Sequence, residues 1–449
     1  MARIRQPIRA PPQEGSSLDD YQQAVDYLLS LQKFGIKFGL NRTENVLARL
    51  GDPQNQYRCI HVAGTNGKGS TAAVLASILR RHGHRVGLYT SPHLVRFTER
   101  FQVDGKEVEP EKIFSAFEDI RRVLDPREPP TFFEAVTAMA FHYFAQEHVE
   151  WAVVETGMGG RLDATNTIRP EAAVITNVSF DHQEYLGRTL SAIAREKAGI
   201  IKPGVPVVTA ARQPVVQSVI KATCLRNDSP LYRLGTHFRV RRNGNGSFGY
   251  YGLRFHWSHI KTPLKGDHQF VNAGLALAAL EVIERSGALI LNPVAVEEGL
   301  SQVRWPARME TLEERPLVIL DGAHNPPGAE CLRSALLHNF TYDKLHLVLG
   351  IMGDKDIRGI FRRLLPLAET AIFTKPRYGR AADPELLRRL ARPYIQKMYA
   401  VPDPAAAIGQ AKALAGPDDL ICITGSLYFA GEVKEIYGEP QAFPGCVFG

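Results

Sequence analysis

The chain has 449 residues, a formal net charge of +7 and an ordinary globular composition, with 44% hydrophobic and 22% charged residues. This length exceeds one ordinary hydrophobic core and predicts two domains. The five cysteines lie far apart and form no CxxC pair, which excludes a disulfide framework and favours a reducing compartment, the cytoplasm. No stretch reaches the roughly 18 uncharged apolar residues of a membrane span, and residues 1–17 lack the apolar region of a signal peptide. We expect residues 1–17 to be a disordered tail.

The positive charge does not indicate nucleic-acid binding, because it is dispersed along the chain. The densest basic run, Arg239–Arg242, adjoins Asn243–Gly246, a segment typical of a hairpin turn. A solvated hairpin explains this run, and a basic excess equally suits small polyanionic substrates such as nucleotides. We therefore expect a monomer with small-molecule partners and with neither nucleic acid nor a membrane as a partner.

The first part of the chain alternates apolar strands with amphipathic helices, the pattern of a parallel sheet with crossover helices. A first helix opens at Ser17, and a stretch rich in hairpins is expected over residues 231–259. The expected strands are 59–63, 86–90, 151–155, 172–176 and 206–210, and the further helices are 43–50, 70–82, 189–198 and 272–285.

The pattern restarts around residues 303–308, where we place the domain boundary. The strands expected beyond it are 317–320, 345–349, 371–374 and 420–424, again alternating with helices. The predicted fold class is α/β. It consists of a P-loop-type parallel sheet in an N-terminal domain, residues 18–304, and a smaller doubly wound, Rossmann-like α/β domain, residues 305–449.

The segment Gly64–Ser70, with the sequence GTNGKGS, follows the first strand and opens a helix. It departs from the strict pattern G-x-x-x-x-G-K-[ST], because its first glycine comes too late and Gly69 separates Lys68 from Ser70. The context is still that of a phosphate loop, since glycines let backbone N–H groups curl around phosphate oxygens at a helix N-terminus. Lys68 would neutralise the terminal phosphates. At this point a glycine-rich turn that happens to carry a lysine remains the alternative.

Polar residues follow four of the predicted strands, at the edge where open parallel sheets bind ligands. They are Gly64, Ser91, Glu155 and the pair Asp181-His182. A carboxylate that ends an apolar strand opposite a phosphate loop is the usual arrangement for holding Mg²⁺ on a triphosphate, so Glu155 is predicted to bind metal. Because Mg²⁺ prefers oxygen ligands, His182 fits a structural residue better on chemistry alone. Together these features predict a Mg²⁺-dependent ATP enzyme.

Several longer stretches point to one family. They are His61–Ser70, Tyr89–Leu94, Glu155–Asn166, Asp181-His182, Arg195–Gly199 and Asp321–Pro326. In this order, over residues 18 to 433, they resemble the bacterial bifunctional members of the dihydrofolate synthase/folylpolyglutamate synthase family, in the Mur ligase superfamily. The resemblance implies that ATP phosphorylates a folate carboxylate and that the amino group of L-glutamate attacks the acyl phosphate. The implied acceptors are dihydropteroate and tetrahydrofolate; folylpolyglutamate synthesis alone is the alternative.

The resemblance also implies roles for individual residues. The ATP-binding residues would be Gly64, Thr65, Asn66, Gly67, Lys68, Gly69, Ser70, Asn272, Arg308, Asp321 and His324. Two Mg²⁺ ions would be held by Ser91, Glu155, His182 and a carbamylated Lys197, and the catalytic residues would be Lys68, His182, Lys197 and Arg308. From the local sequence alone, Lys197 is a surface charge on a helix and Arg308 a linker charge. The nucleotide is expected between the two domains.

Three segments match the dihydropteroate-binding stretches of the bifunctional members. Their residues are Gly39, Leu40, Thr131, Phe132, Phe133, Glu134, Leu162, Asp163 and Ala164. Phe132 or Phe133 could stack on a flat pterin, and Asp163 could accept hydrogen bonds from its amino-pyrimidine edge. The alternative makes both phenylalanines core residues and Asp163 a turn or helix cap.

Two other functions compete with folate ligation. A peptidoglycan-type amino-acid ligase carries a whole further domain before the phosphate loop, whereas only 63 residues precede Gly64 here. A nucleotide-binding switch without ligation would not need a second domain over the site. Dependence of ATP hydrolysis on added glutamate separates that switch from a ligase.

Overall fold

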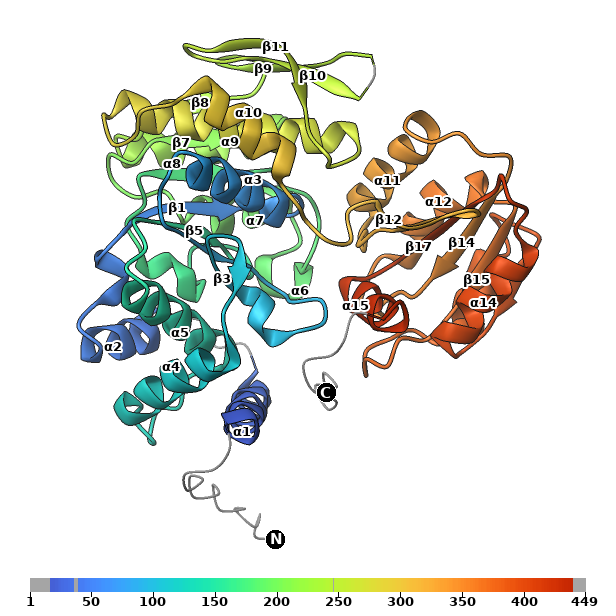
Figure 1. Ribbon diagram of the computed structural model, residues 1–449, viewed down its shortest axis with the longest axis horizontal. Coiled ribbons are helices and arrows are strands. Elements are labelled where there is room, and N and C mark those ends of the chain that lie inside the picture. The colour runs from blue at the N-terminus through green and yellow to red at the C-terminus, as the bar shows by residue number, and fades with distance from the viewer. Residues whose placement is uncertain (1–16, 36–38, 245, 439–449) are drawn as a thin grey trace, which may run out of the picture.

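The chain folds around two large β-sheets, one on each side of Figure 1. The computed structural model describes residues 17–35, 39–244 and 246–438. The expected tail lies outside these ranges up to residue 16. Within them, no helix is both long enough and apolar enough to cross a membrane.

The first sheet has eight strands in the order β4-β3-β2-β5-β1-β6-β7-β8. The strands from β2 to β8 in this order run parallel, and β3 and β4 add an antiparallel hairpin at one edge. The central strands are almost wholly apolar because helices cover both faces of the sheet. The strands are β1 (Arg58–Ala63), β2 (Val86–Tyr89), β3 (Phe101–Val103), β4 (Lys106–Glu107), β5 (Trp151–Glu155), β6 (Ala172–Ile175), β7 (Val207–Thr209) and β8 (Leu231–Arg233).

Helices pack on both faces because successive side chains of a strand point to opposite faces. Ile60 and Val62 of β1 share a core with α3 and α9. Cys59 packs on the opposite face with α1, α2, α4 and α5, and Ala63 on that face with α7 and α8. The helices of this part are α1 (Ser17–Ser30), α2 (Asn41–Arg49), α3 (Lys68–Arg81), α4 (Pro110–Val123), α5 (Phe132–Gln146), α6 (Gln183–Leu186), α7 (Leu190–Ala198), α8 (Pro214–Arg226), α9 (Asp267–Arg285) and α10 (Pro293–Gln302).

A small antiparallel sheet, in the order β11-β10-β9, packs on α9 at the top of Figure 1. Phe248 of β10 stacks on Phe270 of α9, with ring centroids 5.0 Å apart. Glu281 of α9 is only 1% exposed, and its carboxylate accepts hydrogen bonds from the Tyr250 hydroxyl and from the backbone N–H groups of residues 253–255. The strands are β9 (Arg239–Arg242), β10 (Ser247–Tyr251) and β11 (His256–Lys261).

The second large sheet has the order β12-β13-β17-β14-β15-β16, with β12 as its antiparallel edge and all other pairs parallel. Helices α11 to α13 contribute to the core on one face, and α14 and α15 to the core on the other. The strands are β12 (Glu310–Glu314), β13 (Leu317–Leu320), β14 (Leu345–Leu349), β15 (Thr370–Phe373), β16 (Met398–Ala400) and β17 (Leu420–Thr424). The helices are α11 (Pro326–His338), α12 (Ile357–Leu364), α13 (Pro384–Ala391), α14 (Pro404–Leu414) and α15 (Leu427–Ile436).

The predicted α/β class is confirmed, and every predicted strand is present to within one residue at each end. Arg239–Arg242 forms β9, paired antiparallel with β10, as the hairpin interpretation requires. Two predictions need correction. The helix expected from residue 272 begins at Asp267, directly after Gly266, whose φ of 101° ends the preceding segment. Residues 231–233 are not part of a hairpin, since β8 extends the first sheet parallel to β7.

We predict that Glu281→Ala destabilises the small sheet and its packing on α9. The substitution removes the acceptor of four donors, namely the buried Tyr250 hydroxyl and three partly buried backbone N–H groups, and an unsatisfied buried donor costs about 1–3 kcal/mol. We expect the free energy of unfolding to fall by about 3 kcal/mol, measured by urea titration with tryptophan fluorescence, to which Trp257 of β11 contributes. The control is Glu297→Ala on the exposed side of α10, which should change the value by less than about 0.5 kcal/mol. Equal, small changes for both variants would contradict this account of Glu281.

Candidate active site

The loop Gly64–Ser70 connects β1 to α3 and is shaped by two glycines. Gly64 and Gly67 have φ values of 155° and 82°. A Cβ on Gly64 would lie 1.8 Å from Thr176 Oγ1, and one on Gly67 would lie 2.5 Å from Asn272 Oδ1. No side chain fits at either position, so the backbone itself forms the wall of the site, and the N–H groups at the start of α3 are suited to bind an anion.

Two buried hydroxyls at the start of α3 bear on whether this loop binds a phosphate or a hydrated metal. Within the described residues, neither Ser70 Oγ nor Thr71 Oγ1 has a hydrogen-bond partner, although both residues are at most 1% exposed. Buried polar atoms are normally satisfied, and Ser70 lines the cavity beside the loop whereas Thr71 does not, so the Ser70 hydroxyl is the one that indicates a polar ligand.

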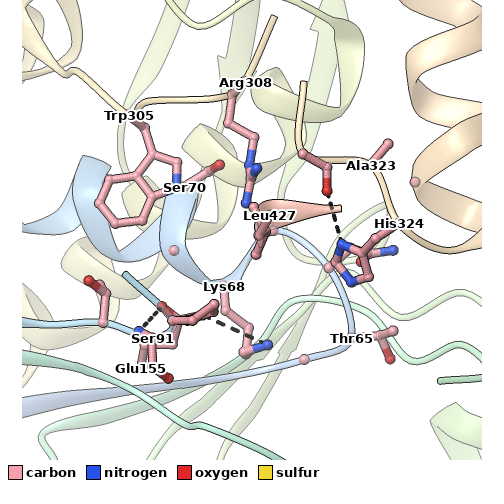
Figure 2. Close-up of a pocket in the computed structure, with 18 of the residues that line it drawn as sticks. Thr65, Lys68, Ser70, Ser91, Glu155, Trp305, Arg308, Ala323, His324 and Leu427 are labelled. Atoms are coloured by element: carbon pink, nitrogen blue, oxygen red, sulfur yellow. Dashed lines mark hydrogen bonds and ion pairs between the residues drawn. The ribbon is translucent and has the colours of Figure 1, made fainter. Parts of the chain in front are cut away.

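Glu155 ends β5 directly opposite this loop. Its Oε1 lies 3.8 Å from Lys68 Nζ, and its Oε2 accepts a hydrogen bond of 3.3 Å from the backbone N–H of Ser91 (Figure 2). Burial raises the pKa of this carboxyl, while Lys68, the Ser91 N–H and Arg308 act in the opposite direction. A desolvated carboxylate beside a phosphate loop is well suited to bind a cation.

Lys197, near the end of α7, is buried and only 4% exposed. Its Nζ donates a hydrogen bond of 2.8 Å to the carbonyl oxygen of Gly64, which places it behind the phosphate loop. Burial, and then the charge of Lys68, lower the pKa of Lys197 to about 7, although Asp181 and Asp163 act in the opposite direction. A large part of this lysine is therefore a neutral amine near neutral pH.

Asp181 lies beyond the end of β6 and contacts the second sheet. Its Oδ1 is 2.8 Å from Lys355 Nζ, and its Oδ2 is 3.6 Å from His324 Nε2. Burial alone would raise the pKa of Asp181, but His324 and Lys355 hold it well below its usual range. The side chain of His182 is 44% exposed, and its pKa lies below the usual value because partial burial and Lys355 outweigh the effect of Asp181.

Three of the residues predicted to bind ATP, Arg308, Asp321 and His324, belong to the second domain. Arg308 lies between Ala307 and Met309, whose φ values of 53° and 48° mark a sharply bent segment. The Asp321 carboxylate accepts hydrogen bonds from the backbone N–H groups of Met309 (3.1 Å) and Ala323 (2.9 Å). Burial raises the pKa of Asp321, and Arg308 opposes the shift. Figure 2 shows Arg308 and Trp305 on the side of the loop opposite to Glu155.

One cavity of about 330 Å³ collects these groups between the two large sheets. All the residues predicted to bind ATP or metal line it, including Asn272 and His182. The sequence analysis assigned no role to several other lining residues: Asp181, His268, Gln269, Trp305, Cys331 and Leu427. Of these, only Asp181 gave a signal in the sequence, through its position after a strand.

Few of the side chains at this site are predicted to bind a metal ion. Within the described ranges, no group of three or more His, Cys, Asp and Glu side chains could hold a metal ion. Mg²⁺ commonly takes one or two carboxylates together with substrate phosphates and water. The site therefore fits Mg²⁺ that arrives with a nucleotide better than a resident metal held by protein side chains alone.

The segments predicted to bind a pterin lie together, beside the main cavity. Helices α2 and α5 pack against each other and against the short 3₁₀ helix η4 (Ala164–Thr167). Gly39 and Leu40 precede α2, whereas Thr131 and Glu134 form the capping box of α5, and Glu134 also binds Arg42 of α2. None of the nine predicted residues lines the main cavity.

Individual side chains in these segments make structural contacts. Phe133 packs over Gly157, and Phe132 lies 5.3 Å from the Arg100 guanidinium carbon; both phenylalanines are only partly buried. Asp163 caps η4 through Thr165 and accepts a hydrogen bond of 2.8 Å from the Met158 N–H. Leu162 is partly exposed and Ala164 is buried. The capping role considered for Asp163 is thus present, and a pterin role requires its remaining acceptor capacity.

Comparison with known proteins agrees with this geometry. Residues 62–280 match the Mur ligase middle domain, and residues 307–427 match the Mur ligase, glutamate ligase domain. The chain is 36% identical over 425 residues to the dihydrofolate synthase/folylpolyglutamate synthase of Bacillus subtilis, covering 92% of this chain and 98% of that protein.

Two solved structures show the same fold at similar identity. Mycobacterium tuberculosis folylpolyglutamate synthase complexed with ADP and AMPPCP has a TM-score of 0.88 and 35% identity, covering 95% of this chain and all of that chain. Escherichia coli FolC in complex with DHPP and ADP has a TM-score of 0.85 and 31% identity, covering 92% of this chain and 97% of that chain. The chain is therefore an ATP-dependent ligase and belongs to the dihydrofolate synthase/folylpolyglutamate synthase family of the Mur ligases.

Proposed function

We propose that this ligase joins L-glutamate to dihydropteroate, forming dihydrofolate, and adds glutamate to tetrahydrofolate. The observation that carries the proposal is the cavity between the sheets, where a phosphate loop and Glu155 face Arg308, Asp321 and His324. The relative from B. subtilis bears both activities in its name, and the E. coli neighbour holds DHPP together with ADP. A folylpolyglutamate synthase without the first activity is the second candidate, favoured by the name of the Lacticaseibacillus casei relative, folylpolyglutamate synthase.

The nucleotide lies along the phosphate loop, with its terminal phosphates at the start of α3. Lys68 neutralises their oxygens, and the orphaned hydroxyl of Ser70 supplies a further polar contact. Asn272, Arg308, Asp321 and His324 hold the rest of the nucleotide from across the cavity. A folate carboxylate takes the terminal phosphoryl group and becomes an acyl phosphate, because a free carboxylate is a poor electrophile. The glutamate amine then displaces phosphate and forms the amide.

Two Mg²⁺ ions would fit this scheme: Ser91 and Glu155 would hold one, and Glu155, His182 and a carbamate on Lys197 would hold the other. Mg²⁺ bound by these residues would supply positive charge to stabilise the transferring phosphoryl group. The residues of the cavity shield the anionic reactants from bulk water and orient them toward each other.

The carbamate forms when the neutral amine of Lys197 attacks CO₂ and loses a proton. Burial of this lysine and its lowered pKa keep a supply of the reactive amine. A free ammonium in the cavity that Glu155 also lines would repel a metal ion, whereas the carbamate attracts it. The same residue thereby changes from a cation into a ligand.

We place the domain boundary between residues 304 and 305, in the bent segment that leads to β12. Both sides of the cavity come from one chain, which supports the proposal of a monomer. Its substrates are small molecules, and the described cysteines form no disulfide, which suits the cytoplasm.

The first test concerns Lys197. Lys197→Ala should lower turnover at least about 100-fold, about 2.7 kcal/mol of transition-state stabilisation, and should remove a carbamate signal from the ¹³C NMR spectrum of protein equilibrated with ¹³C-bicarbonate. Acetate should restore part of the activity. Lys202→Ala is the control, because Lys202 also donates to a backbone carbonyl, that of Asn166, outside the cavity. Recovery with methylamine rather than acetate would contradict a carbamate and leave only the hydrogen bond to Gly64.

The second test concerns Arg308. Arg308→Ala should lower kcat/KM for ATP at least about tenfold, about 1.4 kcal/mol, because one cation facing the phosphates is lost. Binding of dihydropteroate alone should not change. Arg304→Ala, four residues earlier and outside this cavity, is the control and should resemble the wild type. Equal losses of ATP use and dihydropteroate binding would show that Arg308 is not a nucleotide residue.

The third test concerns the acceptor. Phosphate release from ATP and glutamate should occur with dihydropteroate and with tetrahydrofolate; turnover with tetrahydrofolate alone would leave only the polyglutamate activity. Asp163→Ala should raise KM for dihydropteroate at least about tenfold, the loss of one charged hydrogen bond, with little change in KM for ATP. Asp125→Ala, which removes a similar turn carboxylate bonded to the Arg127 N–H, is the control. A larger effect on ATP than on dihydropteroate would mean that the pterin lies elsewhere.

A further inference from the structure

Two side-chain amides from opposite sides of the cavity meet in a reciprocal pair. Asn66 Nδ2 donates to Asn325 Oδ1 over 3.0 Å, and Asn325 Nδ2 donates to Asn66 Oδ1 over 2.9 Å. Asn325 Nδ2 also donates to Asp181 Oδ2 over 2.9 Å. We call Asn66, Asp181 and Asn325 the amide junction. Asn66 lies in the middle of the phosphate loop, whereas Asn325 directly precedes α11 of the second sheet.

Every polar atom of the Asn325 side chain is used. Its Oδ1 accepts the Asn66 amide and also the backbone N–H of Gly328 (2.9 Å), as the N-cap of α11. Its amide hydrogens go to Asn66 and Asp181. Asn325 is 2% exposed, so water has little access to these bonds. Such a buried, fully satisfied network exists in only one relative position of its parts.

The other half of the junction is fastened to the first sheet. The Asn66 carbonyl accepts hydrogen bonds from Thr176 Oγ1 (2.7 Å) and Asn177 Nδ2 (2.9 Å), and its N–H donates to Asn177 Oδ1 (3.0 Å). Both partners directly follow β6. The phosphate loop is therefore held on one side by its own sheet and on the other by the start of α11.

Each end of the Asn66 side-chain amide bonds to Asn325, which leaves one amide hydrogen and one oxygen lone pair for other partners. Asn66 lines the cavity, so besides its predicted contact with the nucleotide it supports the loop through its bonds to Asn325. Asp181 adds a charged contact between the two domains, because its other oxygen, Oδ1, lies 2.8 Å from Lys355 Nζ of the second domain.

We propose that Asn325 is a positioning residue, which couples docking of the second domain to the geometry of the phosphate loop. The inference rests on the proposed ATP site and holds for either folate acceptor. With the domains apart, Asn66 loses its partner and the loop is held from one side only. Phosphoryl transfer then proceeds efficiently only when the second domain, with Arg308 and His324, is in place. The device discourages ATP cleavage before the site is complete.

The test uses Asn325→Ser, because serine still caps α11 but cannot exchange two hydrogen bonds with Asn66. We expect ADP formation at saturating substrates to fall at least about 20-fold, about 1.8 kcal/mol. The Kd for AMPPCP, measured by calorimetry, should stay within about threefold, since the phosphate contacts remain. Small-angle X-ray scattering with AMPPCP should show a larger radius of gyration than for the wild type. Asn325→Asp, which keeps the side-chain size and the N-cap, should likewise lower turnover and leave the Kd for AMPPCP nearly unchanged.

Two comparisons separate positioning from a general loss of structure. Asn292→Ser replaces an asparagine cap of the same kind, at the start of α10 and away from the cavity, and should leave turnover unchanged. Asn66→Ala combined with Asn325→Ser should be no slower than the worse single variant, because both remove one interaction. Losses that multiply in the double variant would overturn the proposal. So would unchanged turnover or an unchanged radius of gyration in Asn325→Ser. If the wild type uses neither folate, the proposed function fails, and the scattering comparison still decides the role of the junction.

Discussion

The site depends on the absence of a side chain at residue 64. Gly64 comes so close to the end of β6 that a methyl group would lie 1.8 Å from Thr176 Oγ1. Because the backbone can approach, the loop that follows β1 turns over the end of β6 rather than away from it, and Thr65 N–H donates to the Asn177 carbonyl. Since β1 lies between β5 and β6, this turn also faces Glu155 at the end of β5. One close contact thus brings the loop, the acidic strand end and the residues after β6 to the same point.

The sequence predicted the sheets well, because buried parallel strands are short apolar runs that few other structures produce. The positions of the strand ends could be predicted equally well, and Glu155, Ser91 and Asp181 were identified as residues at or after these ends. Short polar edge strands such as β4 and β12 were missed, since their residues are half exposed and carry no apolar pattern. Their position depends on a neighbouring strand rather than on their own sequence.

Single residues whose partners are distant in sequence were less accessible. Lys197 is indistinguishable from a surface lysine within its helix, and its partner Gly64 is 133 positions away. Lys355 gave no signal, because its ion pair with Asp181 forms only when two domains meet. The family resemblance supplied Lys197 but no role for Lys355 or Asn325. Contacts of this kind depend on the tertiary fold, so local sequence preferences do not reveal them.

Asp163 shows that a structural and a functional interpretation need not exclude each other. Its carboxylate accepts the Thr165 N–H and hydroxyl and the Met158 N–H. A carboxylate has about four acceptor positions, so one of those of Asp163 is left. The capping bonds fix the direction of that last position. A pre-oriented acceptor binds with less loss of side-chain entropy than a free one, so the cap itself favours recognition.

The opposite pKa shifts in the cavity link the proposed metal to the proposed carbamate. Burial raises the pKa of Glu155 and lowers that of Lys197, because it disfavours charge of either sign. A carbamate on Lys197 without a cation would add a second anion to the cavity that Glu155 lines and cost further desolvation. A cation without the carbamate would meet Lys197, whose protonated form repels it. Each addition is unfavourable alone and favourable in the presence of the other, so CO₂ and Mg²⁺ should bind cooperatively, each increasing the apparent affinity for the other.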